Sequence, residues 1–97
     1  MKLVKESLFT HHLETIILFI ANDSRSRAKQ FSRELQKGLN GLKIFPYKYR
    51  RSFYYESDQI RDYVFKGYTI PYLIDEEKKI IVILDIFKWT DYKGEVQ

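Results

Sequence analysis

The sequence predicts a single α+β domain, in which two N-terminal helices pack against an antiparallel sheet made by the last third of the chain. Two observations carry this prediction. Residues 60–89 are rich in Ile, Val, Tyr and Phe and are interrupted by turn-forming residues at Lys66-Gly67 and at 75–79, as in hairpin-connected strands. In the preceding part, apolar residues recur at spacings of three and four, as in amphipathic helices. With 97 residues, the domain 1–97 has room for one modest core.

The first elements of the chain are a short strand and a helix. Leu3 and Val4 can form the strand, and five apolar residues then share one face at helical spacing. These residues are Phe9, Leu13, Ile16, Ile17 and Ile20. Periodicity alone also allows a buried strand over residues 16–20. A helix places Leu18 and Phe19 on its other side, where they need a second cover.

The second helix has the clearest pattern in the chain. Asn22-Asp23-Ser24 supplies capping side chains at its start, and Gly38 and Gly41 weaken its final turn and mark its end. Its apolar face consists of Ala28, Phe31, Leu35, Leu39 and Leu42. Its outer face carries the basic residues Arg25, Arg27, Lys29, Arg33 and Lys37. Because only about three residues join the two helices, we expect an antiparallel hairpin that covers one face of the sheet.

The strands are predicted from the alternation of their side chains. In the final strand, Ile80 to Phe87, both alternating sets are largely apolar, which predicts a central strand covered on both faces. In the strand before it, Pro71 has no amide hydrogen to donate to a ladder. This residue predicts either an outward-facing backbone position or a bulge in the neighbouring strand.

The connection between helix and sheet is the densest chemical signal in the chain. Residues 43–55 hold four basic side chains, six aromatic side chains and no acidic one. Cations neutralise phosphate and aromatic rings stack on unpaired bases, so this mixture suits a single-stranded nucleic acid. The alternative is that the rings fold back onto the core and the cations are simply solvated. Both interpretations stay open at this point.

The net charge of the chain is +4, from 17 Lys and Arg against 13 Asp and Glu, with a pI near 9.3. This balance suits an acidic partner, either nucleic acid or an acidic protein segment. Cysteine is absent, which excludes disulfides and the usual cysteine-based zinc patterns, and we expect neither a metal nor a cofactor. We see no signal peptide or lipid anchor, and the longest apolar run, residues 15–21, is too short to span a bilayer. We therefore expect a cytoplasmic protein with no membrane contact.

A further signal lies in the order and spacing of five fragments. They are Ile20-Ala-Asn-Asp-Ser-Arg-Ser-Arg-Ala-Lys-Gln-Phe31, Leu42-Lys-Ile-Phe-Pro46, Ile60-Arg-Asp-Tyr-Val64, Gly67-Tyr-Thr-Ile-Pro-Tyr72 and Ile81-Val-Ile-Leu-Asp-Ile-Phe87. With these fragments, nearly the whole chain resembles the RelE/ParE superfamily of type II toxin–antitoxin toxins. The resemblance implies a helical hairpin packed on a small curved antiparallel sheet, with a helix over residues 16–20. It also implies a cognate antitoxin, a small protein whose extended or helical segment wraps the toxin.

The mechanism needs a closer comparison, because this superfamily includes both ribosome-dependent mRNA endonucleases and poisons of DNA gyrase. In the RNA-cleaving branch, the Gly-Tyr pair is typically followed by an Arg, where this chain has Thr69. The last strand of that branch typically ends in an Arg, where this chain has Trp89. The start and the exit of the second helix resemble ParE more closely. The resemblance thus implies a plasmid-stabilising toxin that binds DNA gyrase and inhibits growth without covalent chemistry of its own.

The candidate target-binding residues are five of the cations in the second half of the chain. They are Arg50, Arg51, Arg61, Lys66 and Lys88, with Trp89 and Tyr92 as aromatic neighbours. We expect these side chains to contact the target. For Arg61, an ion pair with Asp85 or Asp62 is an alternative, because paired arginines are common in small sheets.

Two other functions stay open as alternatives. A RelE-like endonuclease would act on mRNA at the ribosome, with Arg61, Lys88 and Tyr92 as its catalytic set and Arg50 and Arg51 binding RNA. A non-toxic relative would only bind an antitoxin and help it on operator DNA.

The two histidines, His11 and His12, lie at the start of the first helix and are remote in sequence from the sheet. Adjacent residues on a helix point about 100° apart. We therefore favour a solvated helix start over a metal-binding or catalytic pair.

The antitoxin is expected to bind the helical hairpin. Leu18 and Phe19 could receive its apolar anchors, and the basic face that includes Arg25 and Arg33 could meet an acidic segment. The alternative for Leu18 and Phe19, which the pattern slightly favours, is burial against the second helix or the first strand.

Overall fold

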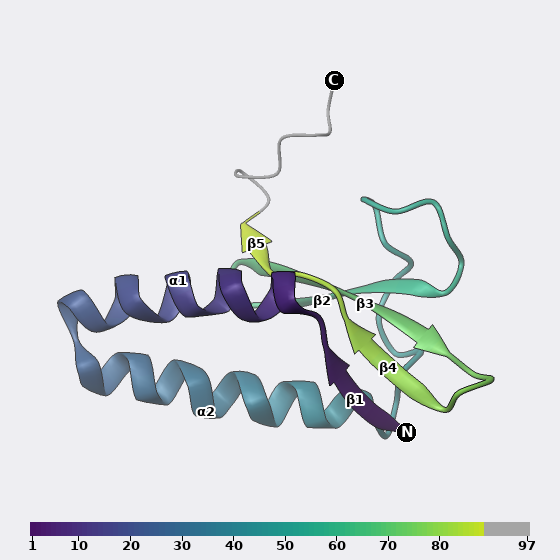
Figure 1. The fold of residues 1–97 in the computed structure, drawn as a ribbon, viewed down its shortest axis with the longest axis horizontal. Helices are drawn as coiled ribbons and strands as arrows, with labels where there is room; N and C mark the ends of the chain where they lie inside the picture. Colours follow the sequence, from purple (N-terminus) through teal and green to yellow (C-terminus); the bar gives the residue numbers. More distant parts are fainter. Residues whose placement is uncertain (89–97) are drawn as a thin grey trace.

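The computed structural model describes residues 1–88, and these residues form the predicted α+β fold (Figure 1). The elements are β1 (Lys2–Lys5), α1 (Ser7–Asp23), α2 (Arg25–Leu42), β2 (Ile60–Phe65), β3 (Tyr68–Asp75), β4 (Ile80–Ile83) and β5 (Phe87–Lys88). The helix predicted over residues 16–20 and the first strand at Leu3 and Val4 are both confirmed. The predicted sites at Trp89 and Tyr92 lie outside the described residues.

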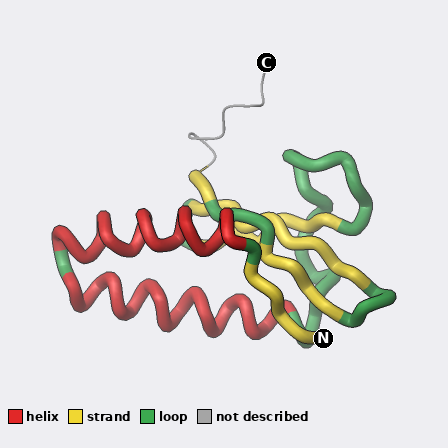
Figure 2. The backbone as a smooth tube through the Cα atoms, in the orientation of Figure 1, coloured by secondary structure: helices red, strands yellow, loops and turns green. Residues whose placement is uncertain are grey.

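The sheet has the order β1-β4-β3-β2, and β5 pairs with β3 beyond the end of β4 (Figure 2). The three antiparallel strands β2, β3 and β4 follow one another as predicted. The sheet is nevertheless mixed, because β1 lies parallel to β4, with Lys2 opposite Ile80 and Lys5 opposite Ile83. The expectation of a wholly antiparallel sheet is therefore wrong at this one edge.

The β2–β3 hairpin shows the turn that the sequence predicts. Phe65 and Tyr68 are paired, and the two residues between them, Lys66 and Gly67, have φ angles of 49° and 85°. Positive φ at both central positions matches the twist of the flanking strands, and glycine adopts it without a steric cost. This turn fixes which side chains of β2 and β3 face the helices.

The break between β4 and β5 is a β-bulge opposite Pro71. Between the pairs Tyr72–Ile83 and Thr69–Phe87, β3 has two residues, whereas the opposing segment has three, residues 84–86. The predicted bulge in the neighbour of Pro71 is thus confirmed, and a single backbone bond from Leu84 N to Pro71 O, at 2.9 Å, bridges the break. Bulges bend a strand and redirect its side chains, which here places Asp85.

The helices form an antiparallel hairpin with a shorter link than predicted. Only Ser24 separates α1 from α2, and its Oγ accepts a hydrogen bond from the backbone N of Arg27 at 3.2 Å, as a helix cap. The helix α2 continues past Gly38 and Gly41 to Leu42. Gly38 lies directly beneath the ring of Tyr63, so α2 approaches β2 closely at this point.

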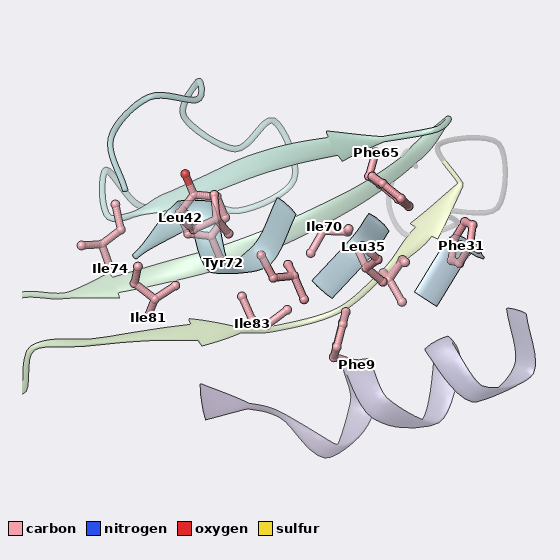
Figure 3. Packing of buried hydrophobic residues seen from close by; sticks show 12 residues of the cluster. Phe9, Phe31, Leu35, Leu42, Phe65, Ile70, Tyr72, Ile74, Ile81 and Ile83 are labelled. Atoms are coloured by element: carbon pink, nitrogen blue, oxygen red, sulfur yellow. The ribbon is translucent and has the colours of Figure 1, made fainter. Parts of the chain in front are cut away.

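The core lies between the helical hairpin and one face of the sheet (Figure 3). The predicted apolar face of α2 is buried in full, at Ala28, Phe31, Leu35, Leu39 and Leu42. It packs with Phe9 of α1 against the sheet residues Phe65, Ile70, Tyr72, Ile74, Ile81 and Ile83. The opposite set of β4, Ile80 and Val82, is only half-buried, so the expected double cover of this strand is only partly present.

Candidate functional site

The main candidate for a binding site is an open groove between α1 and β5, with a volume of about 450 Å³. Its walls include His12, Ile16 and Phe19 of α1 and Tyr68, Phe87 and Lys88 of the sheet. We call it the α1/β5 groove. Most of its wall is apolar, and its polar groups come from both elements. Such a mixture suits a peptide that brings apolar anchors and a few polar contacts.

One end of the groove contains a histidine–carboxylate pair. His12 Nδ1 lies 2.7 Å from Asp85 Oδ1, and the same oxygen accepts a hydrogen bond from the backbone N of Ile86 at 2.7 Å. The side chain of His12 is 43% exposed and that of Asp85 is 14% exposed, so the pair is partly shielded from water. The prediction of a solvated helix start holds for the exposed His11 but is wrong for His12.

Two apolar residues of α1, Leu18 and Phe19, are exposed, and Phe19 lines the groove. Leu18 is 68% exposed and Phe19 is 76% exposed, so the slightly favoured prediction of burial is wrong. The physical reason is the direction of the helix faces. Ile16, Ile17 and Ile20 turn toward the rest of the fold, and the two remaining apolar residues point away from it.

The two basic residues predicted to bind antitoxin lie in a different groove. Arg25 and Arg33 line a shallow groove of about 490 Å³ between the helices, together with Ile17, Ala21 and Ala28. The structure therefore does not gather the four predicted antitoxin-binding residues at one place. Phe19 lines the α1/β5 groove, Arg25 and Arg33 line the groove between the helices, and Leu18 is exposed on α1 outside both.

Three of the five predicted target-binding cations lie together at the edge of β2, where Arg51 forms a β-bridge with Arg61 and follows Arg50, but most of the five have partners within the fold. Arg50 pairs with Asp62 at 3.1 Å, Arg51 with Asp58 at 3.0 Å, and Lys66 with Glu34 of α2 at 2.6 Å. Arg61 donates to the backbone O of Tyr49 at 3.1 Å, and Lys88 lies 5.5 Å from the ring centre of Tyr68. The hydrogen bond from Lys66 lowers the pKa of Glu34 below its ordinary value.

The strand register explains why Arg61 does not take the predicted ion pair. Arg61 lies opposite Tyr72, on the face of β2 that the helices cover, whereas its neighbour Asp62 faces the other side. Asp62 is 1% exposed and pairs with Arg50. Asp85 pairs with His12. Both alternatives named for Arg61 are therefore wrong.

The aromatic residues of the connection 43–59 are divided between surface and core. Phe45, Tyr47 and Phe53 are exposed, whereas Tyr49 packs against the core. The connection is tied to the sheet by Tyr72, whose Oη donates to the backbone O of Pro46 at 2.6 Å. Neither of the two sequence interpretations describes this segment completely.

Thr69 occupies the position where an RNA-cleaving relative would carry a phosphate-binding arginine, and this position is buried. Thr69 is 5% exposed and pairs with Phe87 across the sheet. Among residues 1–88, no group of three His, Cys, Asp or Glu side chains could hold a metal ion. Within the same range, no helix is both long and apolar enough to cross a membrane.

Sequence reasoning missed Asp85 as part of the site, because the pair that it forms joins residues 73 positions apart. The only local signal was Pro71, which indicated a bulge without indicating which side chain the bulge would present.

The fold agrees with a comparison of the chain with protein families. The family model described as ParE toxin of type II toxin-antitoxin system, parDE, matches residues 6–89. The chain therefore belongs to the ParE toxin family, and it is a type II toxin–antitoxin toxin with an antitoxin as partner. No curated protein matches the chain.

Proposed function

We propose that this toxin acts in the cytoplasm by binding DNA gyrase, and that a cognate antitoxin neutralises it by filling the α1/β5 groove. The observation that carries the antitoxin proposal is the exposed apolar surface at Phe19, next to an open, mostly apolar groove. An apolar anchor from an amphipathic segment would displace water from this surface, which is the main source of affinity in helix-in-groove recognition. The basic groove at Arg25 and Arg33 would then meet acidic residues of the same partner.

Gyrase binding is favoured over RNA cleavage by the placement of the cations. Cleavage by a ribose 2′-OH needs an acid, a base and cations gathered around one phosphate. In residues 1–88, Arg50, Arg61 and Lys66 are held by three different partners, and Thr69 is buried. A binding surface can use cations that are each held by a partner within the fold, whereas a catalytic centre needs them gathered around one phosphate.

Ribosome-dependent cleavage of mRNA stays as a second candidate because of one observation. The His12–Asp85 pair lies in the same groove as Lys88 and Tyr68. A histidine oriented by a carboxylate can act as a general acid or base, and a lysine can stabilise a developing phosphate charge. This set differs from the one expected from the sequence, which relied on Arg61.

The two candidates are separated by expressing the toxin without antitoxin and labelling new DNA and new protein in the same culture. Gyrase inhibition predicts that DNA synthesis falls first, with filamentous cells. In a matched assay, purified toxin should increase the linear DNA that gyrase produces from a supercoiled plasmid. An early fall in protein synthesis, with cleaved mRNA, would instead support the second candidate. Undisturbed growth would contradict both.

The antitoxin-binding surface is tested with Phe19→Ser. Loss of an apolar anchor typically weakens binding by 2 kcal/mol or more, so we expect about a 30-fold loss or more of antitoxin affinity by calorimetry. Phe53→Ser is the matched control, because Phe53 is equally exposed, at 76%, but lies on the connection between α2 and β2 and does not line the α1/β5 groove. Equal affinity of the two variants would remove the groove from the proposal.

A further inference from the structure

A further exposed surface is an arginine–aromatic pair on the connection between α2 and β2, beside the candidate target-binding residue Arg51. The side chain of Phe53 is 76% exposed. The guanidinium carbon of Arg50 lies 4.0 Å from the centre of its ring, and Arg51 follows next in the chain. We call these three residues the Phe53 platform. Figure 2 shows the connection in green, extending beyond the sheet and away from the helical hairpin.

The platform is held in place by a buried carboxylate. Asp62 Oδ2 accepts hydrogen bonds from Arg50 Nη2 and from the backbone N of Phe53, both at 3.1 Å. The side chain of Asp62 is fully buried. One oxygen atom therefore fixes both the cation and the backbone that carries the ring. A surface ordered in this way loses little conformational entropy when a ligand binds.

Backbone pairing with the edge of β2 supports the same residues. Arg51 forms a β-bridge with Arg61, and Asp62 N donates to Arg50 O at 3.1 Å. The next residue, Ser52, donates its backbone N to Ile60 O at 2.8 Å. An exposed aromatic ring on a backbone tied to a sheet edge is a rigid surface.

The charge of Arg51 is available to a ligand. Its side chain is 65% exposed and its partner Asp58 is 81% exposed, at 3.0 Å. Ion pairs between such exposed side chains contribute little, so a phosphate can compete for the guanidinium. The whole segment 43–55 carries four basic side chains and no acidic one.

We propose that the Phe53 platform binds single-stranded nucleic acid, with an unpaired base stacked on Phe53 and the adjacent phosphate on Arg51. A ring backed by a guanidinium offers a flat face and a positive field, which match a base and its phosphate. An acidic peptide would satisfy the cations but has no flat group for the ring. The inference goes beyond gyrase binding, because the toxin would bind the nucleic acid directly, in the absence of gyrase.

The test is fluorescence polarisation with the full chain and a labelled twelve-residue oligothymidylate, at several salt concentrations. We expect Phe53→Ala to weaken binding about 5-fold to 150-fold, the usual effect of removing one stacked base contact. Phe53→Trp should keep or strengthen binding, because it keeps the ring face. Arg51→Ala should reduce the slope of log affinity against log salt by about 0.7, the contribution of one phosphate contact on a single strand.

Phe19→Ala is the matched control, since Phe19 has the same exposed fraction, 76%, on α1. It should leave oligonucleotide affinity unchanged. Circular dichroism checks that each variant is folded. The proposal would be overturned by no binding of the oligonucleotide, by equal effects of the Phe19 and Phe53 variants, or by equally tight binding of polyglutamate, which would make the platform a site for acidic protein segments. Equal affinity for a duplex of the same length would also overturn it, because paired bases cannot stack on the ring.

Discussion

Replacing Gly38 by Ala tests how closely α2 packs on β2. A Cβ atom at this position would lie 1.9 Å from Tyr63 Oη and 2.8 Å from Cζ of the same ring. The ring cannot swing away freely, because it packs between Tyr49, at 5.1 Å between ring centres, and Phe65, at 6.2 Å. The new methyl group must therefore displace either the ring or the helix.

The magnitude follows from two opposing terms. Alanine in place of glycine inside a helix contributes about 0.5–1 kcal/mol to the free energy of unfolding. Overpacking of a well-filled interface costs about 1–3 kcal/mol. Gly41 provides the control, because a Cβ atom there meets nothing within 4 Å and only the favourable term applies. The overpacking cost is thus the difference between the two variants.

The assay is thermal unfolding followed by circular dichroism. Gly41→Ala should raise the melting temperature, and Gly38→Ala should melt roughly 4–24 °C below it, since 1 kcal/mol shifts Tm by about 4–8 °C in a domain of this size. Adding Tyr63→Phe removes the oxygen at the closest approach and should reduce the cost of Gly38→Ala. If Gly38→Ala stabilises the protein as much as Gly41→Ala, the close approach of helix and strand has no energetic weight.

Two further predictions concern polar groups in or near the core. Tyr72→Phe should lower stability at neutral pH by about 0.5–1.5 kcal/mol in urea unfolding, because the hydrogen bond to Pro46 O is lost. Burial raises the pKa of Tyr72 above its usual value near 10, so folding favours the neutral phenol. The contribution of this phenol to the free energy of unfolding is complete below pH 10 and declines as the pH rises further. The Tyr72→Phe variant should therefore lose less stability than the parent protein above pH 10. Parallel curves of unfolding free energy against pH would contradict this account. His12→Ala should cost about 0.5–1.5 kcal/mol by removing the bond to Asp85, with faster amide exchange in the bulge as a second measurement; unchanged exchange would show that the pair does not hold the bulge.

The helical part of the fold could be predicted from local patterns. The apolar spacing of α2 predicts all five of its buried residues, because a single strongly amphipathic helix packs with one face only. The Lys66-Gly67 turn is likewise encoded in two neighbouring residues. The parallel β1–β4 pair could not be predicted in this way, since no local signal chooses the edge that a four-residue strand will join.

The site was less predictable, because its contacts depend on tertiary partners. Sequence predicts which side chains are cationic but not which carboxylate each one meets. Asp62 takes Arg50 from the loop and leaves Arg61, its own neighbour, to a backbone oxygen. Similarly, the exposure of Phe19 follows from what the rest of the fold does not cover. Such outcomes depend on the packing of distant segments.

The pairing of β1 with β4 has a consequence for the order of events during synthesis. Residues 2–5 are synthesised well before their partners, residues 80–83. The helical hairpin contains mostly local contacts and can form first, whereas β1 can join the sheet only after residues 80–83 have been made. A nascent toxin would thus expose the helix surfaces that later pack on the sheet until β4 has been made. An antitoxin or chaperone that binds these surfaces before that point would bind a toxin whose sheet is incomplete.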